Sequence, residues 1–174
     1  MTTSLVVTVI GTDRPGIVSM LSDVAQRFSA NWAGSRMASL AGQFAGIVHF
    51  EVADQNAKAL SSALRGLVSS GLHVVIARGD AETAASPRRM VRLELVGHDR
   101  PGIARELSSC LAKRGVSIEE LHTEIASAAM SAEQLFKVKA LFTVPEALAD
   151  DELKRELEAL ANEMMVDIEV GERG

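Results

Sequence analysis

Hydrophobic and polar residues follow two different periods along this chain. Within residues 90–96, apolar Val91, Leu93 and Leu95 alternate with charged Arg92 and Glu94, which is the two-residue period of a half-buried strand. Residues 4–10, SLVVTVI, form a β-branched run that predicts another strand. After each run the apolar positions recur every three or four residues, which indicates an amphipathic helix.

The remaining elements are predicted in the same way. The apolar stripes of the two helices that follow these strands consist of Ile17, Leu21, Val24 and Phe28, and of Ile103, Leu107, Cys110 and Leu111. Further strands are predicted at 33–40, 45–52, 72–77, 117–125, 135–144 and 165–170. Two more helices carry the stripes Leu60, Leu64 and Leu67, and Leu153, Leu157 and Leu160.

The chain is an internal repeat. The turn GTDRPGIV at 11–18 returns as GHDRPGIA at 97–104, 86 positions later. The leucines of the later helices are 93 positions apart, and the extra seven residues are assigned to the connection between the second and third strands of the second copy. The predicted domains are 1–79 and 90–174, joined by a linker at 80–89 with small and polar composition.

Each copy therefore has the element order βαββαβ. This order predicts an α+β fold of two ferredoxin-like units in tandem, each an antiparallel sheet with both helices on one face. A four-stranded sheet with two helices leaves strand edges and one face uncovered. We therefore expect the two copies to pack against each other, within one chain or between two, and edge pairing favours a homodimer.

Composition narrows the function classes. The chain has 174 residues, 47% of them hydrophobic, without an apolar run of the ~18 residues that a membrane helix needs. Its first residues lack the features of a signal peptide, so we expect a cytoplasmic protein without a membrane association. The single cysteine, Cys110, excludes an internal disulfide and is interpreted as a buried core thiol. A net charge of -5 with one Trp and no Tyr argues against direct nucleic-acid binding.

The repeated turn has a structural interpretation. Gly11 suits a tight exit from the strand, Asp13 suits a helix cap that accepts backbone N–H groups, and Pro15 suits the first helical turn. Gly16 is not explained in this way, because a glycine inside the first helical turn costs about 1 kcal/mol relative to Ala. A missing Cβ there allows a ligand to approach the start of the helix. The same holds for the second copy.

The turn also has a chemical interpretation. A helix N-terminus suits an anion, and an adjacent carboxylate suits an ammonium group, which together match a free α-amino acid. A strand, the motif G-x-D-R-P-G-[IV] and an amphipathic helix within a βαββαβ unit resemble the ACT domain, a small module that binds amino acids and similar effectors. Two such units with no enzyme attached resemble the glycine cleavage system transcriptional repressor family.

This resemblance implies an effector site at each repeated turn, between paired domains, together with a polar residue at the start of the second strand. Asn31 offers a donor and acceptors, whereas Ser117 is shorter, so the first site is the stronger candidate. Arg14 and Arg100 are interpreted as surface charges or as clamps on a partner domain. The implied binding residues are Gly11, Thr12, Asp13, Arg14, Pro15, Gly16, Ile17 and Asn31, and Gly97, His98, Asp99, Arg100, Pro101, Gly102, Ile103 and Ser117.

Two functions remain open. No cofactor or metal is expected and the chain is not predicted to be an enzyme, because its four histidines lack metal spacing and no nucleophile motif is present. The resemblance implies a sensor of a small amino acid, glycine or serine, that acts on transcription of glycine-cleavage genes through a transcriptional activator protein. The alternative is an ACT-fold interaction module that binds a protein and no small molecule.

Overall fold

The computed structural model describes residues 1–79, 88–127 and 133–172. The chain divides into two compact units, Met1–Thr83 and Ala84–Gly174, each with its own hydrophobic core. Most of the predicted linker lies outside the described residues. Its last two residues, Arg88 and Arg89, belong to a strand, because the backbone of that strand pairs well beyond its apolar stretch.

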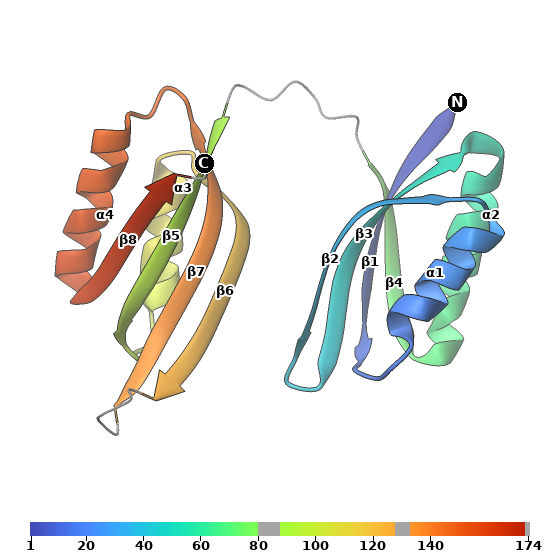
Figure 1. The fold of residues 1–174 in the computed structure, drawn as a ribbon, viewed down its shortest axis with the longest axis horizontal. Coiled ribbons are helices and arrows are strands. Elements are labelled where there is room, and N and C mark those ends of the chain that lie inside the picture. Colours follow the sequence, from blue (N-terminus) through green and yellow to red (C-terminus); the bar gives the residue numbers. More distant parts are fainter. Residues whose placement is uncertain (80–87, 128–132, 173–174) are drawn as a thin grey trace. The chain divides into compact units, whose positions relative to one another are not determined.

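Each unit has the predicted element order (Figure 1). Unit 1 contains β1 (Thr2–Thr12), α1 (Ile17–Arg27), β2 (Asn31–Leu40), β3 (Gln43–Ala53), α2 (Asp54–Arg65), the 3₁₀ helix η1 (Gly66–Ser70) and β4 (Leu72–Arg78). Unit 2 contains β5 (Arg88–His98), α3 (Ile103–Lys113), β6 (Ser117–Ser127), β7 (Gln134–Pro145), α4 (Asp150–Met164) and β8 (Val166–Glu172).

The sheet order confirms the predicted fold class. The strands lie in the order β2-β3-β1-β4 in unit 1 and β6-β7-β5-β8 in unit 2, and every neighbouring pair is antiparallel. The helices of each unit lie on one face of its sheet (Figure 1). The turn after β1 or β5 therefore starts from a central strand. The strands paired on both sides of that strand fix the position of the turn.

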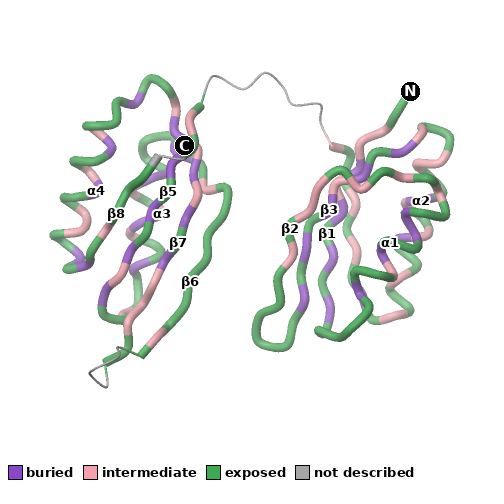
Figure 2. The backbone as a smooth tube through the Cα atoms, viewed as in Figure 1, coloured by how far each residue is buried: buried purple, intermediate pink, exposed green. Residues whose placement is uncertain are grey.

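One face of each sheet forms the core. Leu5, Val7 and Val9 of β1 are at most 3% exposed, and Phe50 of β3 packs with them under the helices. The residues between them along β1 and β3 point to the other face. Buried and exposed positions therefore alternate along each of these strands (Figure 2). We call this uncovered side the open face of the sheet.

Four sequence predictions needed correction at element ends. Phe28 lies past the end of α1. Leu67 lies in η1, because α2 ends before Gly66, a poor helix former. Unit 2 has Ala159 at the position of Gly66, and α4 continues through it. Met165, predicted as the start of a strand, is instead the C-cap of α4 and has a left-handed backbone conformation with φ 54°.

The seven extra residues of unit 2 do not all lie in the connection between its second and third strands. Strand pairing sets Gln43 against Thr12 and Leu135 against His98, so six of the extra residues precede β7 and one follows it.

Gly11 provides a test of the packing between β1 and β4. A Cβ on Gly11 would lie 2.8 Å from the carbonyl oxygen of Gly71 and 2.8 Å from Cδ2 of Leu72. We expect Gly11→Ala to lower the free energy of unfolding by about 1–3 kcal/mol, as overpacking does. Gly34→Ala is the matched control in the same sheet, since a Cβ there meets no atom within 4 Å. Equal denaturation midpoints for the two variants would contradict the close approach.

Candidate functional site

The second glycine of the repeated turn has a backbone role. Gly16 and Gly102 have φ 94° and 104° and lie at the N-cap, just before the helices begin at Ile17 and Ile103. The prediction of a glycine inside the first helical turn was therefore wrong. The left-handed conformation costs a residue with a Cβ roughly 1–2 kcal/mol. Both glycines are therefore explained without a ligand, and a substitution at Gly16 perturbs folding.

Asp13 does not cap α1. Neither α1 nor α3 has a side-chain cap among the described residues, and Pro15 precedes the helix instead of occupying its first turn. The backbone N–H of Asp13 donates to the carbonyl oxygen of Gly42, at 2.9 Å, and its carboxylate accepts a hydrogen bond from Oγ of Ser39, at 2.6 Å. The left-handed Gly16 separates the carboxylate from the helix, and the β2–β3 hairpin binds it instead.

Asp99 has the same backbone contact and a different side-chain environment. Its N–H donates to the carbonyl oxygen of Gln134, at 2.9 Å. The position equivalent to Ser39 is Ile125, which offers no hydroxyl group. Among the described residues, the Asp99 carboxylate therefore has no hydrogen-bond partner, and the two predicted sites are not equivalent.

The two arginines each hold the turn within their own unit. Arg14 donates from Nη2 to the carbonyl oxygen of Ser70, at the end of η1. Arg100 instead makes two hydrogen bonds to Glu106, of 3.0 and 3.3 Å, where unit 1 has Met20. The hydrogen bond from Arg100 lowers the pKa of Glu106 below its ordinary value, and the same bond raises the pKa of Arg100.

The residues beside the turns lie at the ends of the central strands. Thr12 pairs with Gln43, and His98 pairs with Leu135. Nδ1 of His98 also lies 3.8 Å from a carboxylate oxygen of Glu133. Thr12 and His98 thus lie between the repeated turn and the start of the neighbouring strand, β3 or β7.

Asn31 and Ser117 lie away from the turns. Asn31 pairs with Glu51, which also pairs with Ser4, so the start of β2 lies at the start of β1. Asp13 contacts the opposite end of β2 at Ser39, about 26 Å along the strand at ~3.3 Å per residue. Nδ2 of Asn31 donates to Glu51, and Oγ of Ser117 accepts from Arg88. The structure of one unit does not bring these residues together with its turn.

Ser39, Gly42 and Ser70 are the contacts that the sequence analysis missed. Ser39 and Gly42 belong to the β2–β3 hairpin, and Ser70 ends η1. Strand order places the end of β2 beside the end of β1 through β3, so knowledge of the register would have pointed to Ser39.

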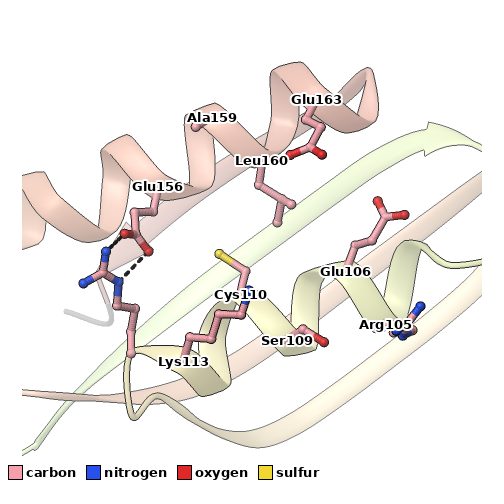
Figure 3. Close-up of a pocket in the computed structure, with 10 residues that line it drawn as sticks. Arg105, Glu106, Ser109, Cys110, Lys113, Glu156, Ala159, Leu160 and Glu163 are labelled. Carbon is pink, nitrogen blue, oxygen red and sulfur yellow. Dashed lines mark hydrogen bonds and ion pairs between the residues drawn. The ribbon is translucent and has the colours of Figure 1, made fainter.

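Unit 2 has a groove of about 850 Å³ between α3 and α4. Cys110 lines it and is half-buried, with its sulfur between the two helices (Figure 3), so the prediction of a buried core thiol was wrong. The equivalent position in unit 1 is Val24, which is 2% exposed. The groove is otherwise lined by Arg105, Glu106, Ser109, Lys113, Arg114, Glu156, Ala159, Leu160 and Glu163.

Neither a membrane-spanning helix nor a metal cluster is found among the described residues. No helix in this part of the chain is long and apolar enough to cross a membrane. The same residues contain no group of three or more His, Cys, Asp or Glu side chains arranged to hold a metal ion.

Comparison with known families agrees with the duplicated fold. The ACT domain profile matches residues 3–76 and again residues 89–171. The chain belongs to the ACT domain family. Each match spans one βαββαβ unit with its repeated turn.

Solved structures resemble the whole of this ACT domain protein. An unknown protein from Galdieria sulphuraria is 33% identical, with a TM-score of 0.89 and 100% of both chains covered. A candidate glycine cleavage system transcriptional repressor is 20% identical, with a TM-score of 0.73 over 98% of this chain and 97% of the other, and shows the same fold. No functionally curated protein matches the sequence.

The Arg100–Glu106 pair predicts a shifted titration. Since the pKa of Glu106 is lowered in the folded protein, the pair stabilises the fold above the ordinary value of 4.5 and loses that contribution as the pH falls through the lowered pKa. Carbon-detected NMR of the Glu106 carboxyl should show this pKa rising toward its ordinary value in Arg100→Gln. Arg105→Gln, which removes a weaker and purely Coulombic effect, should move it less. An unchanged pKa in Arg100→Gln would contradict the pairing.

Proposed function

We propose that this ACT domain protein is a regulatory protein that binds a small amino acid, glycine or serine, at the turn of unit 1. In this proposal the ligand controls transcription of glycine-cleavage genes through a transcriptional activator protein. The observation that carries the proposal is the start of α1, which lacks a side-chain cap among the described residues and begins four residues after Asp13.

The first turn of α1 has the chemistry for the carboxylate end of an amino acid. The first N–H groups of a helix lack acceptors within the helix, and the dipole favours a negative charge there. The first turn of α1 contains no acidic residue to oppose that charge. The backbone N–H groups of Ile17, Val18 and Ser19 are the donors that we assign to the ligand carboxylate.

Asp13 has the chemistry for the ammonium end. One oxygen of its carboxylate accepts the hydroxyl of Ser39, which leaves further lone pairs on the group for an N–H donor. Ser39 holds the carboxylate on the hairpin, away from the N–H groups that it would otherwise cap. Asn31, at the far end of β2, is not part of a site formed by its own unit's turn.

Unit 2 is the weaker site in this proposal. Glu106 lies in the first turn of α3, and one of its carboxylate oxygens lies 3.4 Å from the position of a Cβ on Gly102. This negative charge disfavours a second carboxylate at the same helix start, although Arg100 neutralises part of it. We therefore expect one strong site per chain.

The gene target and the protein partner come from similarity. The fold is shared with a candidate glycine cleavage system transcriptional repressor, and the net charge of -5 does not favour a DNA-binding surface. An effect on transcription would then pass through another protein. Ligand binding would change the population of the form that binds this partner.

Calorimetric titration tests the proposal. Glycine or serine should give saturable heat with the wild-type protein, and a bulky control such as phenylalanine should give none. Asp13→Asn should weaken binding at least tenfold, because the amide still accepts the Ser39 hydroxyl but no longer carries the charge that pairs with the ammonium group. Thermal melts of each variant show whether the fold is retained.

Asp99→Asn is the matched control, since it makes the same change in the equivalent turn and should leave the strong site intact. Loss of binding in Asp99→Asn alone would move the site to unit 2. No heat with any amino acid at millimolar concentration would favour the interaction module without a small-molecule ligand.

A further inference from the structure

The open faces of the two sheets carry different chemistry at equivalent positions. In unit 1, Thr8 of β1 lies opposite Ile47 of β3 and Val75 of β4. In unit 2, the corresponding row of β5, β7 and β8 consists of Glu94, Lys139 and Glu169. On these three strands, the same backbone framework thus presents uncharged side chains in one unit and three charged side chains in the other.

The adjacent rows follow the same trend. Ile10 lies opposite Ala45 in unit 1, and the equivalent pair in unit 2 is Val96 opposite Lys137. On the other side, Val6 of unit 1 corresponds to Arg92 of unit 2. The three central rows of the unit 1 face on β1, β3 and β4 contain two histidines and otherwise uncharged residues, namely Val6, Thr8, Ile10, Ala45, Ile47, His49, His73, Val75 and Ala77.

These apolar side chains are accessible on unit 1. Ile10 is 47% exposed, Ile47 51% and Val75 68%. Ile47 and Val75 flank Thr8 from the two neighbouring strands, and Ile10 is the next residue of β1 on this face, so the three lie on one surface. Single exposed hydrophobic residues are normal, but a contiguous apolar patch marks an interaction surface. We call this surface the apolar sheet face.

The equivalent face of unit 2 has the charges that are typical of a surface exposed to water. Its row carries both signs of charge, and Nζ of Lys139 lies 4.0 Å from a carboxylate oxygen of Glu94. Burying those charges against an apolar partner would cost their hydration without full compensation. The charged face is therefore a poor partner for the apolar sheet face, whereas a second apolar sheet face is a good one.

The area is sufficient for a dimer at the lower limit of stable interfaces. The whole open face of unit 1, with four strands about 4.8 Å apart and about eight residues long, measures roughly 500 Å² and includes the apolar sheet face on three of these strands. Two such faces bury roughly 1,000 Å² in total, which is about the minimum for a specific interface. Because a two-fold dimer uses the same patch on both chains, one apolar face is enough to form it.

We propose that two copies of this chain associate through their apolar sheet faces, with Thr8, Ile47 and Val75 at the centre of the contact. The two unit 1 sheets pack face to face, and the side chains of the two rows interdigitate. Arg36, in the same row on the edge strand β2, is exposed and lies at the rim, where its guanidinium keeps access to water. This interface differs from pairing along strand edges, because it uses the central strand β1.

Sedimentation equilibrium of the full chain tests this interface. The wild-type protein should have twice its chain mass of 18.5 kDa. The triple variant Thr8→Glu, Ile47→Lys and Val75→Glu should have the mass of one chain. This variant gives unit 1 the same three charged side chains that unit 2 has at the equivalent positions, Glu94, Lys139 and Glu169, so we expect the sheet of unit 1 to fold with them. Val68→Lys, a charge added at a 59% exposed residue of η1, should remain dimeric.

Cross-linking tests the same contact without added charge. In a Cys110→Ser background, Thr8→Cys should be linked between two chains by a short bismaleimide, and Val68→Cys should not. A monomeric wild-type protein at all concentrations would overturn the proposal. A dimer that survives the triple variant, or one that is not linked through position 8, would overturn it in favour of another surface such as the β2 edge.

Discussion

The hydrogen bond from the repeated turn to the neighbouring hairpin is the contact on which both units depend. Asp13 donates its backbone N–H to Gly42, and Asp99 donates to Gln134, at 2.9 Å in both units. Together with the left-handed glycine that follows, this bond turns the chain from the central strand onto the helix layer. Since the backbone makes the contact, the turn keeps its shape in both units while the side chains around it differ.

The side chains have diverged around that shared backbone. In unit 1 the turn is held by Ser39 and by the carbonyl oxygen of Ser70, and the first turn of α1 contains no acidic residue. In unit 2 the arginine of the turn pairs with Glu106 on its own helix. The duplication thus yields one helix start suited to an anion and one that an ion pair already occupies.

The units also differ in the surfaces that they present. Unit 1 combines a well-packed helix layer with an apolar open face, while unit 2 combines a groove between its helices with a charged open face. The groove arises where Cys110 and Glu106 of unit 2 replace Val24 and Met20 of unit 1. The ligand site and the dimer surface that we propose therefore use different parts of unit 1, both built on one fold.

The sequence by itself determined the duplication, the element order and the fold class. Strand and helix periods report which face of each element is buried, and residues 86 positions apart, such as Asp13 and Asp99, mark the repeat directly. The identity of the residues in the repeated turn could also be read from the sequence. The family resemblance followed from that motif and its position after a strand. Tertiary structure decided which residues meet. Asp13 binds Ser39 instead of the helix because Gly16 adopts a left-handed conformation, and no local pattern shows this. Asn31 lies far from the turn because β1 and β2 both run antiparallel to β3, which places their starts at the same end. Contacts between distant segments depend on strand register, and the periodicity of one segment does not contain that register.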